Sequence, residues 1–350
     1  MSNISSCLSP SVPTDLTLAP LERQLDADIA YYRRHALATN TKKTYATQLR
    51  RYFSFCATYN YTPVPASQLT LIRYTAHLAL TLSHSSVTSY LNAVRFLHVH
   101  TGFPNPLESN HELSMVLKGI GNVKGMNPHR KFPITPDILL SIRNKLNLLA
   151  VSDVNFWAAC LTLFFSFLRK SNVFPASQST TTGLRVIRRG DVRVLQDSSL
   201  SGLVLFVRWT KTIQAQQRIL TCPLPFLPNH PLCPCAALIR AFLSPALPED
   251  APLFHSRAPS GNITPMTYDN FIARLRSLLD SLGYSPSRYT GHSFRRGGAS
   301  WAMQQGLSVD VIKIMGDWQS DAYASYLTMP LSHRFQSARL FSANLPTTST

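Results

Sequence analysis

The sequence predicts a mainly α-helical protein with a small antiparallel β-sheet, divided into a helical N-terminal domain and an α+β C-terminal domain. Apolar residues recur at helical spacing between residues 21 and 120 and again through much of the C-terminal half. Strand-like alternation is confined to residues 185–222. A segment rich in Gly, Pro and basic residues lies between the two regions, and this composition is typical of a linker.

Domain boundaries follow from these patterns. With 350 residues, the chain is long enough for two domains that each bury their own core. Polar composition and little apolar periodicity predict disorder at both ends. The expected order is a disordered tail at 1–19, a helical domain at 20–122, a basic linker at 123–134, an α+β domain at 135–343 and a disordered tail at 344–350.

The N-terminal domain is expected to be a bundle of short helices. Predicted helices cover residues 21–32, 41–53, 67–82, 86–100 and 108–120. The second begins after the capping residue Thr41 and carries basic residues on its polar side. Such a face is either an ordinary solvated surface or a contact surface for a polyanion. The residues that would make this contact are Lys42, Lys43, Tyr45 and Arg50.

The C-terminal domain begins at Thr135-Pro136-Asp137, which combines a capping residue, a proline and a dipole-compatible acid. The most apolar helix is expected at 155–168, and Arg169 follows it directly. Strands are predicted at 185–187, 203–209 and 218–222, so Lys211 lies in the turn of a hairpin. Further helices are expected at 234–243 and 267–282, and a short one around 335–341.

Charge indicates a polyanionic partner. The chain has 34 Lys and Arg against 17 Asp and Glu, a net charge of +17. The excess occurs in both parts. Residues 1–130 include 12 basic and 6 acidic residues, and residues 131–350 include 22 basic and 11 acidic residues. Nucleic acid is the commonest partner of such proteins.

The scattered cysteines form no regular disulfide framework, which indicates a reducing, intracellular compartment. A zinc site at Cys222, His230, Cys233 and Cys235 is a weak alternative, because paired C-x2-C spacing is missing. The longest apolar run, 156–168, is too short to span a membrane, and no signal peptide is recognised. The sequence therefore predicts no cofactor and no membrane association.

The most informative stretch is 290–301, Thr-Gly-His-Ser-Phe-Arg-Arg-Gly-Gly-Ala-Ser-Trp, followed by Gly316-Asp-Trp318 and by 322–327. Helical spacing places His292 and Arg295 one turn apart on one face, with a break at Gly306 before a second short helix. Guanidinium binds two phosphate oxygens and imidazole exchanges protons near neutral pH. A phosphodiester is the expected ligand.

His292-x-x-Arg295, Trp318 and a tyrosine eight residues later resemble the C-terminal signature of the tyrosine recombinases, the phage-integrase family. The resemblance implies a core-binding domain followed by a catalytic domain, with an arginine after a buried helix and a lysine in a β-hairpin. Tyr326 fits the nucleophile position better than Tyr323, which stays an alternative. One departure is Asn172, where the family has an acidic residue. The implied catalytic set is Arg169, Lys211, His292, Arg295, Trp318 and Tyr326.

The resemblance implies a site-specific DNA recombinase or integrase that cuts and rejoins strands through a 3′-phosphotyrosine, without metal or ATP. A type IB topoisomerase-like enzyme and an inactive DNA-binding descendant are the alternatives. The implied partners are double-stranded DNA and three further copies, in a tetramer formed through residues 331–341. Similarity to crypton and DIRS-type mobile elements would imply a nuclear location. The remaining predicted DNA contacts are Lys124, Arg130, Lys131 and Arg296.

Overall fold

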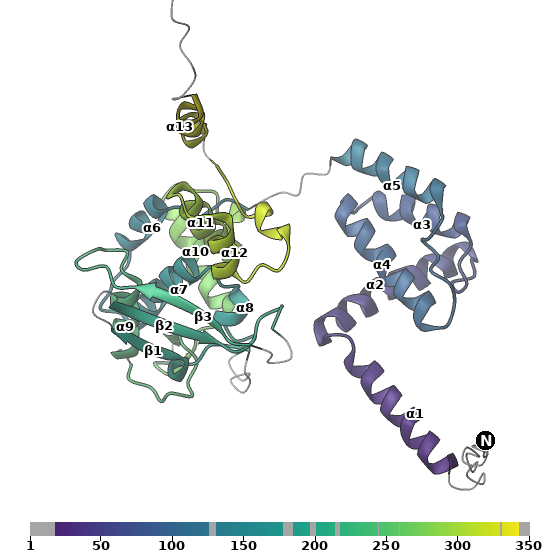
Figure 1. The fold of residues 1–350 in the computed structure, drawn as a ribbon, viewed down its shortest axis with the longest axis horizontal. Coiled ribbons are helices and arrows are strands. Elements are labelled where there is room, and N and C mark those ends of the chain that lie inside the picture. The colour runs from purple at the N-terminus through teal and green to yellow at the C-terminus, as the bar shows by residue number, and fades with distance from the viewer. Residues whose placement is uncertain are drawn as a thin grey trace, which may run out of the picture. The chain divides into compact units, whose positions relative to one another are not determined.

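In the computed structural model, the chain forms two compact units, residues 1–128 and 129–350, and each is described by itself (Figure 1). The structure describes residues 18–125, 131–177, 185–196, 201–213, 218–243, 245–258, 260–329 and 331–342. The predicted tails and Arg130 therefore lie outside the described residues, apart from the start of the first helix.

The first unit is helical, as the apolar spacing predicts. Tyr52, Phe55, Leu71, Tyr74 and Leu91 form the centre of its core, and all of them are buried. Ser67, Ser83 and Asn110 begin helices by accepting a hydrogen bond from a backbone N–H of the first turn. The helices are α1 (Leu18–His35), α2 (Thr39–Tyr59), α3 (Gln68–Ala79), α4 (His84–His100) and α5 (His111–Lys124).

The second unit is built around the apolar helix α7 (Val151–Ser166). Nearly all of its side chains are buried, and it contacts α9, α11, β3 and β4. Because α7 is enclosed on all sides, the chain that leaves it at Phe167 enters the interior of the unit. The other helices are α6 (Pro136–Arg143), α8 (Lys170–Val173), α9 (Pro234–Leu243), α10 (Tyr268–Ser281), α11 (Gly291–Gln304), α12 (Val309–Gly316) and α13 (Leu331–Ser342), with 3-10 turns η1 (Arg189–Asp191), η2 (Pro286–Arg288) and η3 (Asp321–Ser325).

The β-structure of the second unit is antiparallel. β1 (Val192–Gln196), β2 (Ser201–Val207) and β3 (Leu220–Pro225) form a sheet in that order. The strand predicted at 185–187 is wrong, because these residues lie outside the sheet and β1 begins five residues later. A second hairpin, β4 (His255–Arg257) with β5 (Ile263–Pro265), was not predicted because each strand has only three residues.

The segment predicted as a linker contains the division between the units, yet its described ends are ordered. Helix α5 continues to Lys124. On the other side, the backbone N–H groups of Phe132 and Ile134 donate to the carbonyls of Arg288 and Ser293. Ile134 is fully buried in the core of the second unit. This core therefore begins one residue before the predicted domain start.

The five described cysteines are buried free thiols. At the weakly predicted zinc site, Cys233 Sγ accepts hydrogen bonds from backbone N–H groups, and Cys235 Sγ–H donates to Leu224 O. Among the described residues, no group of three or more His, Cys, Asp or Glu side chains is arranged to hold a metal ion. Within the residues that the structure describes, no helix is both long and apolar enough to cross a membrane.

Candidate active site

Arg295 lies at the centre of the candidate site. It projects from α11 and is 1% exposed. Its Nη1 donates to Phe167 O and its Nη2 donates to Gly316 O at 2.6 Å. The guanidinium carbon lies 3.7 Å from the centre of the Trp318 ring. One side chain therefore joins α11 to the ends of α7 and α12.

Two glycines let α11 come this close to its neighbours. A Cβ at position 297 would lie 1.8 Å from Ile134 O, and one at position 298 would lie 2.0 Å from Phe164 O. Gly-Gly after Arg295-Arg296 is thus a packing requirement. The close approach brings Arg295 against the end of the buried helix α7.

The carbonyl groups that hold Arg295 belong to helix ends with unusual backbone geometry. Phe167 ends α7 with φ of 51°, and Asp317 ends α12 with φ of 53°. Left-handed conformations cost a residue with a Cβ roughly 1–2 kcal/mol, and in proteins they concentrate at functional sites. The carbonyl of Phe167 itself accepts from Arg295, and Asp317 directly follows Gly316, whose carbonyl accepts the second hydrogen bond.

Tyr326 completes an aromatic cluster over Arg295. Its ring lies 5.4 Å from the Trp318 ring in an edge-on arrangement and 6.1 Å from the His292 ring. The guanidinium carbon of Arg295 is 5.3 Å from the centre of the Tyr326 ring. Tyr323 packs against the same hydrophobic cluster as Trp318, but its ring faces Lys313, whose Nζ lies 5.0 Å from the ring centre. Of the two tyrosines, Tyr326 is therefore the one that lies beside Arg295, Trp318 and His292.

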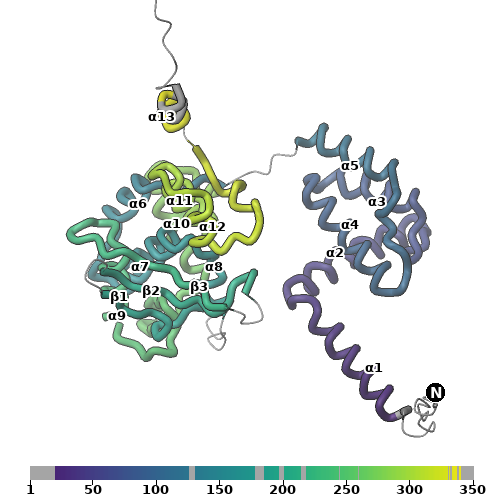
Figure 2. The backbone as a smooth tube through the Cα atoms, viewed as in Figure 1, coloured from purple at the N-terminus to yellow at the C-terminus, as the bar shows by residue number. Residues whose placement is uncertain are grey.

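The segment that carries Tyr326 folds back along α11, as Figure 2 shows. Arg296, Ser300 and Gln304 lie four residues apart on one face of that helix. Arg296 Nη2 donates to Ser325 O at 2.7 Å, and Gln304 Nε2 donates to Thr328 O at 3.4 Å. Between them, Ser300 Oγ donates to Tyr326 O and accepts from Thr328 N–H. Tyr326 is thus held in the site of its own chain.

His292 lies at the start of α11 with its side chain only partly open to solvent, and positive groups surround it. Desolvation lowers the pKa of His292, and the charges of Arg295, Lys170, Arg169 and Arg296 lower it further. The imidazole is therefore neutral at pH 7 and can accept a proton. It is also surrounded by cations that would attract an anion.

Burial lowers the pKa of Arg295 to about 9, and the nearby charge of Arg169 contributes to this shift. Helix α7 ends at Ser166, two residues earlier than predicted, so Arg169 follows Phe167 and Leu168 and stands at the N-cap position of α8. Lys170, which the sequence interpretation passed over, lies with Nζ 3.4 Å from the centre of the Tyr268 ring. The charge of Lys170 acts on His292, and its position directly after Arg169 was the only sequence signal for it.

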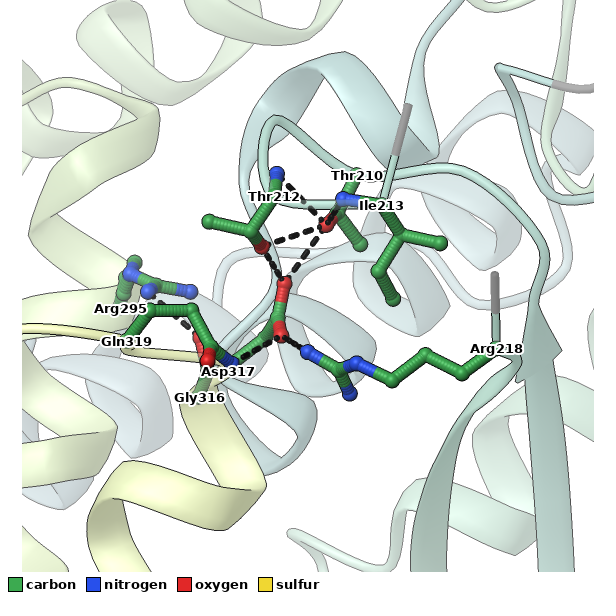
Figure 3. A network of polar contacts seen from close by, with 8 residues as sticks. All are labelled: Thr210, Thr212, Ile213, Arg218, Arg295, Gly316, Asp317 and Gln319. Carbon is green, nitrogen blue, oxygen red and sulfur yellow. Dashed lines mark hydrogen bonds and ion pairs between the residues drawn. The ribbon is translucent and has the colours of Figure 1, made fainter. Parts of the chain in front are cut away.

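Asn172 binds the chain just before Lys211. Its Nδ2 donates a hydrogen bond to Trp209 O at 2.6 Å, two residues before the lysine. Directly before and directly after the lysine, Thr210 and Thr212 donate hydrogen bonds to the carboxylate of Asp317 (Figure 3). The backbone of the Lys211 loop is therefore fastened on both sides, by residues that the sequence interpretation did not include in the site.

The predicted DNA-contact residues differ in their surroundings. Lys42 Nζ donates to Arg34 O, while Tyr45 packs against Phe96 with ring centres 5.1 Å apart. Lys124 Nζ donates to Leu82 O and Lys131 Nζ donates to Ser287 O. The exposed residues of this set are Lys42, Lys43, Arg50, Lys124 and Lys131.

Comparisons with known proteins agree with this architecture. No protein-family model matches the chain. A curated protein described as an integrase/recombinase XerD homolog, from Selenomonas ruminantium, is 23% identical over 283 residues, covering 79% of this chain and 77% of the relative.

Solved structures give a similar result. The Tn1549 transposon integrase in complex with circular intermediate DNA aligns with a TM-score of 0.55 and 15% identity, covering 89% of this chain and 96% of that one. The XerH recombinase bound to a palindromic difH substrate aligns with a TM-score of 0.53 and 12% identity, covering 79% of this chain and 73% of that one. A lambda integrase dimer on a COC′ core site aligns with a TM-score of 0.52 and 14% identity, covering 88% of this chain and 81% of that one.

The second unit, mainly helical with a small antiparallel sheet, has the fold of a tyrosine recombinase catalytic domain. The sequence resemblance to the tyrosine recombinases, the phage-integrase family, is confirmed. The narrower relation to crypton and DIRS-type elements stays a prediction.

Proposed function

We propose that the chain is a tyrosine recombinase that cleaves and rejoins DNA strands through a 3′-phosphotyrosine. One observation carries the proposal: Tyr326 lies over the buried guanidinium of Arg295, beside Trp318 and His292, where four cationic groups converge. Within the described residues, Arg295 Nε and Trp318 Nε1 are buried without a hydrogen-bond partner. Buried donors of this kind suit the oxygens of a phosphate.

In the proposed reaction, the Tyr326 hydroxyl attacks a DNA phosphorus and its proton passes to neutral His292. The new bond joins the phenolic oxygen to phosphorus, and the bond from phosphorus to the 5′ oxygen breaks. Arg169 and Arg295 stabilise the charge on the non-bridging oxygens, and Trp318 donates one hydrogen bond. Preorganised donors of this type contribute about 10²–10³-fold each to the rate.

Lys211 supplies the proton that the departing 5′ oxygen needs, so proton transfer balances on both sides of the phosphorus. Rejoining is the reverse step, with a 5′ hydroxyl of the same or another strand as nucleophile. The phosphotyrosine ester retains the energy of the broken bond, and no cofactor enters the scheme. The exchange of partners between two duplexes makes this reaction a recombination.

DNA contact by both units is part of the proposal. The excess of basic residues in 1–130 and in 131–350 supports it, since affinity for DNA comes largely from phosphate neutralisation. We also propose a homo-tetramer on paired DNA sites, joined through α13, where Leu331 and Phe335 are 68% and 65% exposed. If the chain belongs to the crypton or DIRS branch, this reaction takes place in the nucleus.

The test is a covalent trap on nicked suicide DNA, in which the cleaved strand diffuses away and the phosphotyrosine accumulates. Wild-type protein and the matched variant Tyr323→Phe should form the adduct, whereas Tyr326→Phe should form none while still binding DNA. A wild-type chain that binds the DNA but forms no adduct would make it a DNA-binding protein without strand-transfer activity. Relaxation of supercoiled plasmid by a monomer, without synapsis, would indicate a topoisomerase instead.

A further inference from the structure

The loop that carries Lys211 is fastened to the end of α12 through one buried carboxylate. Asp317 Oδ2 accepts a hydrogen bond from Thr210 Oγ1 at 2.6 Å and another from Thr212 Oγ1 (Figure 3). These threonines are the sequence neighbours of Lys211. Arg218, which follows the loop, donates to Asp317 Oδ1. The carboxylate thus binds the chain before, directly after and beyond the lysine.

The loop has its own internal order, which makes this attachment effective. Thr210 Oγ1 accepts from the N–H groups of Thr212 and Ile213, both at 3.1 Å. Its single proton goes to Asp317, so the donor and acceptor capacity of this buried hydroxyl is used completely. Displacement of Asp317 would therefore release the whole turn around Lys211.

The residue type at position 317 is not explained by the backbone. A left-handed residue at a helix C-terminus is usually Gly or Asn. Asp317 is instead 3% exposed, so its carboxylate requires compensation. Burial raises the pKa of Asp317, but the hydrogen bonds from Thr210, Thr212 and Arg218 outweigh this and lower it overall. The carboxylate is therefore ionised at neutral pH.

The neighbours of Asp317 in sequence hold the rest of the site. Gly316 O accepts from Arg295 Nη2, and the Trp318 ring lies beneath the Arg295 guanidinium. A Cβ at position 316 would lie 1.7 Å from the Trp318 ring, so only glycine fits between them. Three consecutive residues thus fix the arginine, the hairpin loop and the indole relative to one another.

We propose that Asp317 is a positioning residue that holds Lys211 in register with the phosphate site formed by Arg295, Trp318 and Tyr326. The inference rests on the proposed strand cleavage, in which Lys211 protonates the leaving oxygen. Asp317 itself touches neither the DNA nor the reacting atoms. It acts by keeping the proton donor at the right place, and a misplacement of about 1 Å costs on the order of 100-fold in rate.

The test compares two DNA substrates, one with the normal 5′ oxygen and one with sulfur at that bridging position. Thiols are far more acidic than alcohols, so a sulfur leaving group departs without a proton donor. Asp317→Asn should cut the oxygen substrate about 100-fold more slowly, as expected for a misplaced general acid. On the sulfur substrate the same variant should lose less than about threefold, and Lys211→Ala should show the same selective rescue.

Thr212→Val removes one of the two threonine hydrogen bonds and should give the same pattern with a smaller loss, about tenfold on oxygen. Asp310→Asn is the matched control, because Asp310 is an exposed acid in the first turn of α12. It should change neither rate. Thermal unfolding of each variant shows whether the chain is folded.

The result that overturns the inference is an equal effect of Asp317→Asn on both substrates, whether a shared loss or no loss, with wild-type protein cutting both. If Asp317→Asn does not fold, Thr212→Val decides, and an unchanged ratio between its two rates refutes the positioning role. Failure of the proposed function is distinguishable, because wild-type protein would then cut neither substrate.

Discussion

Ser300→Ala tests whether α11 holds the Tyr326 segment in place. Ser300 is 3% exposed, and its hydroxyl donates to Tyr326 O at 3.3 Å and accepts from Thr328 N–H at 2.8 Å. Alanine fills nearly the same space but leaves the Thr328 amide without this acceptor. Thr328 is exposed and this hydrogen bond is only partly buried, so its loss costs the net value of a hydrogen bond, roughly 0.5–1.5 kcal/mol. Since about 1.4 kcal/mol is a factor of ten, local opening of residues 326–328 should become about two- to tenfold more frequent.

Hydrogen exchange at the Thr328 amide measures this opening directly. The amide should exchange about two- to tenfold faster in Ser300→Ala, with DNA affinity unchanged. Single-turnover cleavage of suicide DNA should also slow in this variant, because the backbone of Tyr326 is held less precisely. Ser281→Ala is the matched control, because that hydroxyl donates to Leu278 O within its own helix. Unaltered exchange at Thr328 in Ser300→Ala would refute the idea that this contact holds the tyrosine.

Gly316→Ala should displace Trp318 from beneath Arg295, destabilise the second unit by about 1–3 kcal/mol and change the tryptophan fluorescence. Because the pKa of His292 is lowered, the acid limb of kcat/KM for cleavage should lie below pH 6.5, where the free imidazole becomes protonated. Burial lowers the pKa of His255 to about 4. As pH falls below 6.5, the unfolded chain binds a proton at His255 before the folded chain does. Between neutral pH and pH 5 the wild-type protein should therefore lose about 2 kcal/mol more free energy of unfolding than His255→Gln, measured by urea unfolding.

Each of these has an outcome that contradicts it. Gly119→Ala is the control for the first, because a Cβ there meets no atom within 4 Å. Equal stability of the two glycine variants would show that the indole tolerates the methyl group. An acid limb at or above pH 6.5 would mean that the pKa of His292 is not lowered in the free protein. Parallel pH profiles for wild type and His255→Gln would exclude His255 as a source of acid sensitivity.

The sequence predicted most of the helices, because apolar spacing in the helices around residues 52, 74 and 91 reflects a core that encloses them. It failed where tertiary contacts override local pattern. The strand expected at 185–187 satisfies the alternation rule, but Ile187 is buried in the core of the second unit and its backbone pairs with Asn172 and Leu253. Short strands such as β4 and β5 carry too few residues for any period to be visible.

The candidate site was partly readable because the His292-x-x-Arg295 spacing is local and helical. The contacts that position its members are not local. Asp317 and Thr210 are 107 residues apart, and neither has a neighbour in sequence that indicates the other. The sequence did present an aspartate directly before Trp318 and threonines on both sides of Lys211. Without coordinates, those are ordinary capping and loop residues.

The way Arg295 is held explains why so many unusual features meet at this one place. A guanidinium at 1% exposure, near Arg169 and with its pKa lowered to about 9, is desolvated and still charged at pH 7. Two backbone carbonyls and the face of Trp318 compensate part of that charge. Such an arrangement is costly for folding alone, because carbonyl dipoles replace water incompletely. It becomes favourable when an anion approaches, since the donors are already oriented and no water has to reorganise. The strained helix ends at Phe167 and Asp317 therefore maintain a cationic centre that is better matched to a phosphate than to the isolated protein.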